Sequence, residues 1–506
     1  MALVCGMAVD EIQEPVEDGL FARPFGLLLF GQAVVETVVV VHERGHQIAE
    51  MALARLYCLT GEKKYLDEAR FMLDYRGRTT HRARYSQSDK PITEQTEAWG
   101  HAVRAGYMYA GIADVAALTG DSAYIKAINA IYDNIVSRKY YLTGGVGASR
   151  RMGEAFGADY DLPNLMAYNE TCAAIAAVYL FERMFLLHGD AKYIDCLERT
   201  LYNGVISGMS VDGGKFFYPN PLSSDGVYRF NSERTLTRQP WFGCACCPSN
   251  VCRFIPSMPG YVYGVRGDSL YVNLFTGNTA TVELSGKRVI LEQETQYPWD
   301  GDIALRIVQN RAHDFSLMIR IPGWVQNRVV PSDLYSYANT VEQHYRVEVN
   351  GQTVSTAAFE KGYLNIRRKW KKGDVVRIHF DMPARTVKAH PAVSEDVGRI
   401  AVERGPLVYC AEGVDNQGIA LHHVLMAHRP QFSLQPGYAI VNTEGDGKPF
   451  QVTAINVPVQ EVNLDADCRL SSRNISLRLI PYYAWNHRGA GTMDVWLASS
   501  LKGLDD

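Results

Sequence analysis

Two adjacent cysteines, Cys246 and Cys247, lie in the segment WFGCACCPSN, and Cys172 follows Glu170 closely in an upstream NETC segment. Adjacent thiols do not readily form a disulfide with each other, so another role is expected for the pair. One carboxylate and three thiolates can together close a tetrahedral zinc site. The residue types therefore predict a metal site. They leave open whether the metal would stabilise the fold or take part in a reaction.

The spacing of these ligands differs from that of common structural zinc sites. Closed structural sites usually draw their cysteines from C-x2–4-C pairs, and a glutamate ligand is more typical of catalytic zinc. Here one half of the set is Glu170-Thr171-Cys172, and the other half is the adjacent pair. A thiol–disulfide redox role is less favoured, because CACC lacks the C-x-x-C motif at a helix start. The residues alone leave both a structural and a catalytic metal open.

Three further residues could take part in chemistry. Glu154 follows the glycine-rich segment LTGGVGAS, where it could be a solvated loop residue or a general acid that protonates a leaving oxygen. The glycine-rich segment is not a phosphate-binding loop, because no Gly-Lys-Ser/Thr follows it. His46 and His101 each follow a glycine at the start of an expected helix. Such a histidine either caps its helix or faces a central cleft.

A degenerate repeat in the first half of the chain predicts the elements that carry these residues. The segments LTGEKKYLD, LTGDSAYIK and LHGDAKYID each follow an apolar helical stripe, at residues 59–67, 118–126 and 187–195. Their glycine can end a helix in the left-handed conformation, and the acidic residue after it suits the start of the next helix. Recurring helical hairpins of this kind build solenoids or closed α/α toroids.

The second half has the pattern of an all-β protein from about residue 260. Alternating polar and apolar residues at 267–284, an Asn-Gly turn within 347–354 and the run VVRIHF at 375–380 predict strands. Shorter runs at 477–485 and 493–498 continue the pattern. One or two β-sandwiches are therefore expected.

Composition limits the classes of function. A net charge of −4 without a basic run argues against nucleic acid or an anionic membrane as a partner. The apolar segment 25–41 carries Glu36 near its centre, which disfavours a membrane span, and the N-terminus has no basic region of a signal peptide. A reduced, cytoplasmic setting is expected. Four scattered cysteines are then predicted to be buried apolar residues: Cys58, Cys196, Cys410 and Cys468.

Four segments together resemble glycoside hydrolase family 127, the β-L-arabinofuranosidases: GGVGAS…GEAFG, YNETCA, FFYPNPL and WFGCACCPSNVCRF. The segment PYYAWNHRGAGTMDVWL is similar to the C-terminal signature of that family. The resemblance covers about residues 42 to 500. It implies an (α/α)6 barrel followed by β-sandwiches, which agrees with the helical pattern followed by the β pattern.

The resemblance implies a zinc-dependent retaining exo-glycosidase that releases L-arabinose from β-L-arabinofuranosides. The residues that match the zinc ligands of the family are Glu170, Cys172, Cys246 and Cys247. Cys246 would also be the nucleophile and Glu154 the acid/base, so that a thioglycosyl intermediate forms and is hydrolysed with net retention. Three residues match substrate-contacting positions: His46, His101 and Tyr218.

The chain differs from the family at its N-terminus. Residues 1–41 resemble no part of it, and six or seven long helices are expected before residue 260, where a closed barrel has twelve. We therefore expect an incomplete (α/α)6-type barrel at 42–260, a β-sandwich at 261–385 and a C-terminal β-sandwich at 386–506. The exposed helix faces of an incomplete barrel would favour self-association, for instance as a homodimer.

Three hypotheses follow from these observations. The first is the zinc-dependent glycosidase, acting on an oligosaccharide or another glycoside. The second is a non-catalytic, zinc-stabilised carbohydrate-binding protein or an inactive fragment of the family. The third is another sugar enzyme with an α/α barrel, such as an epimerase or an unsaturated uronide hydrolase. That third class would not need the cysteine pair, so it ranks last.

Overall fold

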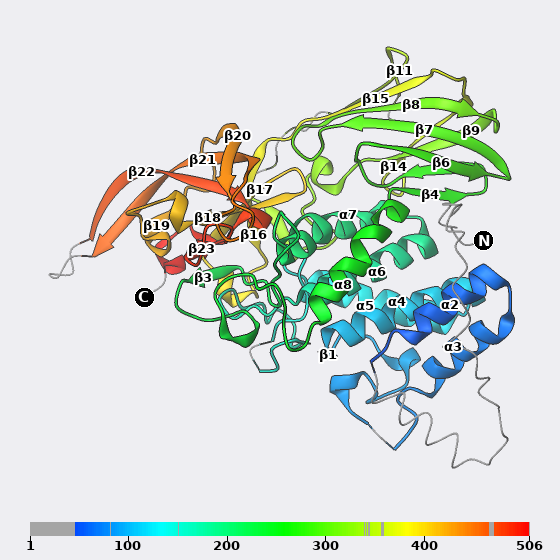
Figure 1. The fold of residues 1–506 in the computed structure, drawn as a ribbon, viewed down its shortest axis with the longest axis horizontal. Helices are drawn as coiled ribbons and strands as arrows, with labels where there is room; N and C mark the ends of the chain where they lie inside the picture. Colours follow the sequence, from blue (N-terminus) through cyan, green and yellow to red (C-terminus); the bar gives the residue numbers. More distant parts are fainter. Residues whose placement is uncertain are drawn as a thin grey trace.

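The computed structural model describes residues 46–504 apart from 81, 150, 339, 341, 343–344, 356–358 and 465–469. The predicted N-terminal segment 1–41 and Cys468 lie outside the described residues. Figure 1 shows a helical part, in blue to green, followed by β-sheets in green to red. The prediction of a helical region followed by β-sheets is confirmed.

Each of the three repeat segments joins two helices, as the glycine signal predicted. The first helix of each pair ends at Gly61, Gly120 or Gly189, whose φ angles of 72°, 70° and 66° are left-handed. This is the backbone region that glycine adopts without strain. The helices are α2 Ala49–Thr60, α3 Lys63–Tyr75, α4 Ala102–Thr119, α5 Ser122–Arg138, α6 Thr171–His188, α7 Ala191–Arg199 and α8 Cys246–Phe254.

Helix α4 packs between α2 and α6, and α8 packs against α6. The approach of α4 to α6 is close, because a Cβ added at Gly106 would lie 2.7 Å from the Cβ of Ala176. Helix α6 is long and apolar enough to cross a membrane, but 83% of its apolar window is buried inside the protein. It is therefore the central core helix of the helical part, apolar on all sides because other helices surround it.

Helix α2 turns one face to solvent while its other side packs against α3 and α4. Leu59 is 76% exposed, and Cys58 beside it is exposed as well. The prediction that Cys58 is buried was wrong, because its position on an apolar helical stripe does not say which helices cover that stripe. Cys196 and Cys410 are buried as predicted.

Two antiparallel-rich sheets follow the helices and form the upper layers in Figure 1. One has the order β12-β11-β15-β8-β7-β6 and the other β13-β14-β9-β5-β4. The predicted Asn-Gly turn joins β11 to β12, with φ angles of 53° at Asn350 and 80° at Gly351. The strands are β4 Tyr263–Arg266, β5 Ser269–Val272, β6 Asn278–Leu284, β7 Lys287–Thr295, β8 Asp302–Asn310, β9 Asp314–Arg320, β11 Tyr345–Val349, β12 Gln352–Thr353, β13 Phe359–Glu360, β14 Tyr363–Lys369 and β15 Val375–Phe380.

A third, 11-stranded sheet contains most of the C-terminal strands and also β3 and β10 from earlier in the chain. The run predicted at 493–498 forms two strands, because the Val495 N–H leaves the ladder and donates to the Leu222 carbonyl at 3.0 Å. The strands are β3 Ser223–Asp225, β10 Tyr335–Tyr337, β16 Ala384–Ala389, β17 Arg399–Arg404, β18 Leu407–Glu412, β19 Val424–Leu425, β20 Ser433–Val441, β21 Pro449–Leu464, β22 Leu470–Pro481, β23 Thr492–Asp494 and β24 Leu497–Ala498.

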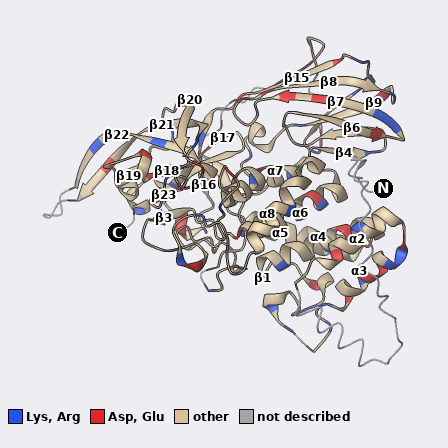
Figure 2. Ribbon diagram, viewed as in Figure 1, with Lys and Arg blue, Asp and Glu red and all other residues tan. Residues whose placement is uncertain are grey.

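Buried ion pairs join the helical part to the sheets. Arg320 on β9 is fully buried and contacts Asp195 at 2.8 Å and Glu198, both on α7. Arg199, at the end of α7, donates to Glu403 on β17 at 2.9 Å. Such pairs cost free energy to desolvate, and removing one partner leaves an unpaired buried charge. The remaining charges of both signs are interspersed over the helices and the sheets, as Figure 2 shows.

One buried carboxyl couples the C-terminal sheet to the segment that precedes α6. Asn164 donates its amide N–H to Asp396 at 2.8 Å. Burial raises the pKa of Asp396 from 3.8 to about 7. Because the folded pKa lies above the unfolded one, the stability contributed by the proton is present below about pH 4 and is lost as the pH rises through about 7.

We expect Asp396→Asn to reduce the dependence of stability on pH. The wild-type protein should lose roughly 2 kcal/mol at this site between about pH 5 and pH 8, and the variant should not. Urea unfolding at both pH values measures the difference, with the exposed Asp67→Asn as a matched control. An equal change in the free energy of unfolding between the two pH values for wild type and Asp396→Asn would contradict the raised pKa assigned to Asp396.

Candidate active site

The four helices α2, α4, α6 and α8 begin close to one another, and the residues at their starts are those predicted from the sequence. His46 precedes α2, His101 is the N-cap of α4, Glu170 is the N-cap of α6 and Cys246 is the first residue of α8. The rings of His46 and His101 lie 5.5 Å apart, and Cys246 Sγ lies 3.5 Å from Glu170 Oε1. Converging helix N-termini favour anionic groups between them.

The predicted ligand set forms one cluster. One ligand atom from each of Glu170, Cys172, Cys246 and Cys247 lies within 4.8 Å of all the others. The Sγ atoms of Cys172 and Cys247 are 3.5 Å apart, and Cys247 Sγ lies 3.6 Å from Glu170 Oε1. Three of the four residues are buried, and Cys246 is partly exposed. One member of the cluster is thus open to a reactant.

The cluster has the chemistry of a cation site. Glu170 Oε2 is buried and has no hydrogen-bond partner among the described residues. Burial raises the pKa of Glu170 and of Cys247, because charge is costly there without a counter-ion. A divalent cation among these donors would supply that counter-charge. One carboxylate and three sulfur donors fit zinc.

Cys246 differs from the other two thiols. Hydrogen bonds with Cys172, Cys247 and Tyr218 lower the pKa of the Cys246 thiol, in that order of size. Its thiol donates to the phenolic oxygen of Tyr218 at 2.9 Å, and that phenol donates in turn to Cys244 Sγ at 3.8 Å. Cys246 therefore combines exposure with a stabilised thiolate, the two properties that make a cysteine nucleophilic.

Glu154 is brought to the site by a short β-ladder. Strand β2, Ala155–Phe156, pairs with β1, Gly100–His101, and places His101 opposite Ala155. The Nε2 atom of His101 lies 3.5 Å from Glu154 Oε1. Burial lowers the pKa of His101 and of His46, so both rings are neutral at neutral pH. They can exchange hydrogen bonds with a neutral ligand such as a sugar.

One residue of the site gave no signal in the sequence. Tyr85 donates its phenolic O–H to Glu154 Oε1 at 2.7 Å, and its ring lies 5.7 Å from that of His101. Tyr85 comes from a 3-10 turn, Arg84–Ser86, between α3 and α4. A single tyrosine in a connecting segment carries no spacing pattern, so only the folded chain reveals it.

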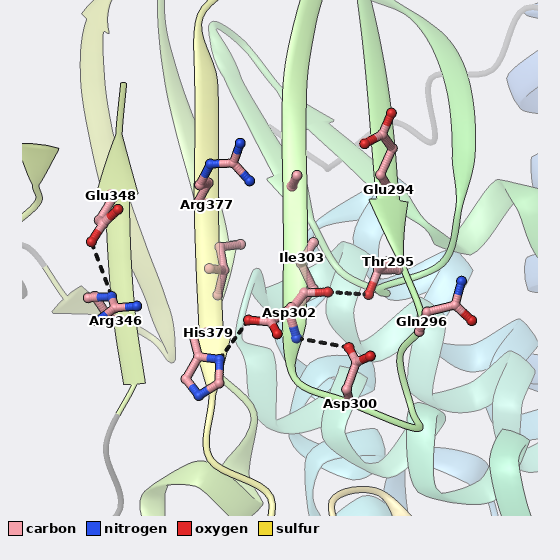
Figure 3. Close-up of a pocket in the computed structure, with 12 residues that line it drawn as sticks. Glu294, Thr295, Gln296, Asp300, Asp302, Ile303, Arg346, Glu348, Arg377 and His379 are labelled. Atoms are coloured by element: carbon pink, nitrogen blue, oxygen red, sulfur yellow. Dashed lines mark hydrogen bonds and ion pairs between the residues drawn. The ribbon is translucent and has the colours of Figure 1, made fainter. Parts of the chain in front are cut away.

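A cavity lies on the polar face of the six-stranded sheet (Figure 3). Two ion pairs line it: His379 Nδ1 lies 2.7 Å from Asp302, and Arg346 lies 3.1 Å from Glu348. No cysteine lines it. The cavity offers no thiol nucleophile, so the thiol cluster is the better candidate for a catalytic centre.

Comparisons with known proteins show the family to which the chain is similar. The chain matches models of the GH127 catalytic domain of β-L-arabinofuranosidases over residues 31–260, of the GH127 middle domain over 269–382 and of the family 127 C-terminal domain over 384–498. It is 35% identical, over 491 residues, to the non-reducing end β-L-arabinofuranosidase of Bifidobacterium longum subsp. longum. That alignment covers 89% of this chain and 70% of the relative.

Two solved structures are similar over most of the chain. One is a GH127 β-arabinofuranosidase, with 56% identity and a TM-score of 0.84, covering 91% of this chain and 70% of that one. The other is a GH127 β-L-arabinofuranosidase from Geobacillus stearothermophilus T6, with 38% identity and a TM-score of 0.79, covering 90% and 72%. By its domain matches and its curated relative, this chain is a glycoside hydrolase and belongs to glycoside hydrolase family 127.

Proposed function

We propose that the protein is a zinc-dependent retaining exo-glycosidase that releases L-arabinose from β-L-arabinofuranosides. The observation that carries the proposal is the partly exposed Cys246, whose thiolate is stabilised by Tyr218 at 2.9 Å beside a buried set of metal donors. The relatives named above supply the substrate class. His46 and His101 are proposed to bind the hydroxyl groups of the sugar.

The proposed reaction has two steps. Cys246 Sγ forms a bond to the anomeric carbon while the bond to the leaving oxygen breaks, and Glu154 gives its proton to that oxygen. Glu154, now a carboxylate, takes a proton from water, and the water oxygen displaces the thiolate. Two displacements at one carbon give net retention. Tyr218 accompanies the thiolate as a hydrogen-bond donor before attack and after release.

Zinc would be held by Glu170, Cys172, Cys246 and Cys247, and when bound it would keep the thiols ionised at neutral pH. The fully buried Cys247 is proposed to anchor the ion, and the partly exposed Cys246 to react. Metal binding to such a set also stabilises the folded chain.

We expect the wild-type protein to contain one zinc ion per chain by elemental analysis, and Cys247→Ala to lose most of it and to melt at a lower temperature. The exposed Cys244→Ala is the matched control and should keep both metal and melting temperature. Full metal content in Cys247→Ala would contradict the ligand set.

Turnover of 4-nitrophenyl β-L-arabinofuranoside tests the activity itself. Wild-type protein should release nitrophenol, and proton NMR of the first sugar product should show the β anomer. A protein that binds zinc and hydrolyses no furanoside would support the alternative, a non-catalytic carbohydrate-binding member of the family.

The helices are proposed to form part of an (α/α)6-type barrel. In support, the helices that share the site, α2, α4, α6 and α8, pack in sequence, and each of the first three is followed by a hairpin partner. The exposed face of α2 around Leu59 would suit self-association, so a homodimer is the proposed assembly.

A further inference from the structure

The phenol of Tyr85 and the imidazole of His101 meet at the same oxygen of Glu154. Tyr85 Oη lies 2.7 Å from Glu154 Oε1, and His101 Nε2 lies 3.5 Å from it. Burial and the hydrogen bond to Glu154 raise the pKa of the Tyr85 phenol, so it keeps its proton and acts as the donor. Because Glu154 Oε1 already accepts the hydrogen bond from Tyr85, the proton of the carboxyl group is held less readily on Oε1 than on Oε2.

The turn that carries Tyr85 is held by buried polar groups. Gln87 is buried in the left-handed region, at a φ of 56°, and its side-chain amide donates to the Tyr85 carbonyl at 3.0 Å. Gln47 donates to the Ser86 carbonyl at 3.0 Å and to Gln87 Oε1 at 3.1 Å. A Cβ at Gly100 would lie 2.4 Å from the Tyr85 carbonyl oxygen, so the neighbouring strand fits only glycine there.

These contacts fix the backbone of Tyr85, although its side chain remains 39% exposed. A left-handed non-glycine residue costs of order 1–3 kcal/mol and persists only where its surroundings impose it. Buried amide networks add rigidity when their groups are satisfied. The Tyr85 hydroxyl is thus held in a fixed position beside the Glu154 carboxylate.

We propose that Tyr85 is a positioning residue for Glu154: it occupies Oε1, so that Oε2 carries the proton delivered to the leaving oxygen and later receives the proton of water. The proposal rests on the acid/base role given to Glu154 in the proposed function. Tyr85 lies outside the sequence motifs, and its hydrogen bond would determine which carboxyl oxygen of Glu154 reacts.

The test is Tyr85→Phe, which removes one hydroxyl group and keeps the ring. A misplaced acid matters most when the leaving group is basic, since a good leaving group departs without a proton. For methyl β-L-arabinofuranoside we expect kcat/KM to fall about 30-fold, and for the 2,4-dinitrophenyl glycoside less than about 3-fold. The melting temperature should not change. Tyr75→Phe, at a tyrosine that is 40% exposed, is the matched control and should leave both rates unaltered.

The outcomes distinguish failure of the positioning role from failure of the proposed function. Equal losses on both substrates, or no loss on either, would overturn the positioning role. Absence of wild-type turnover on both glycosides would overturn the proposed function instead. A selective loss in Tyr85→Phe that resembles a weaker form of the loss in Glu154→Gln supports the proposal.

Discussion

Cys246→Ser is expected to lower kcat/KM for 4-nitrophenyl β-L-arabinofuranoside by at least about 10³-fold, the scale seen when a covalent nucleophile is removed. The serine hydroxyl keeps its proton at neutral pH, and the neighbouring Tyr218 phenol, whose pKa is raised by burial, keeps its own proton and offers no base. Glu154 is engaged by Tyr85 and His101. The variant therefore lacks the thiolate that is proposed to attack the anomeric carbon.

Loss of turnover must be separated from loss of the metal. Glu170, Cys172 and Cys247 remain as buried donors in the variant, so zinc should be retained, with a melting temperature close to that of wild type. Cys252→Ser changes an exposed cysteine of the same helix and should be fully active. A Cys246→Ser protein that keeps a tenth of wild-type activity would exclude Cys246 as the nucleophile.

Glu154→Gln is expected to produce the second large loss, about 10²- to 10⁴-fold on glycosides with basic leaving groups. The amide is close to the carboxyl group in shape but cannot donate a catalytic proton or accept one from water. On the 2,4-dinitrophenyl glycoside the first step should survive, and the intermediate should accumulate because water is no longer activated. Pre-steady-state measurements would then show a burst of phenol followed by slow turnover.

Azide gives an independent check on the same residue. A small anion that needs no base should attack the accumulated intermediate and restore turnover of the activated substrate, giving a glycosyl azide of retained configuration. Glu94→Gln, an exposed glutamate in the same part of the chain, should show neither the loss nor the rescue. If azide had no effect and all substrates were affected equally, Glu154 would not be the acid/base.

The helical hairpins and the cluster of thiols could be predicted because their signals are local. Gly61, Gly120 and Gly189 end helices through their own backbone freedom, whatever surrounds them. The cysteine pair and the NETC segment have few uses other than metal binding or covalent chemistry. Their residue types therefore predict a common site.

Other features depend on long-range packing and could not be predicted. Cys58 lies on an apolar stripe, yet its exposure is decided by which helices cover α2. The break between β23 and β24 depends on a hydrogen bond from Val495 to the distant Leu222. Tyr85 reaches Glu154 across 69 positions of sequence, through a turn fixed by the side chains of Gln47 and Gln87.

The most direct test of the cysteine mechanism is to identify the residue to which the sugar becomes covalently attached. Wild-type protein incubated with an activated 2-deoxy-2-fluoro β-L-arabinofuranoside should gain the mass of one fluorosugar, because the fluorine slows hydrolysis of the intermediate more than its formation. Peptide mapping should place the added mass on Cys246, as a thioether. An adduct on Glu170, or full turnover with inversion and no adduct, would contradict the cysteine mechanism.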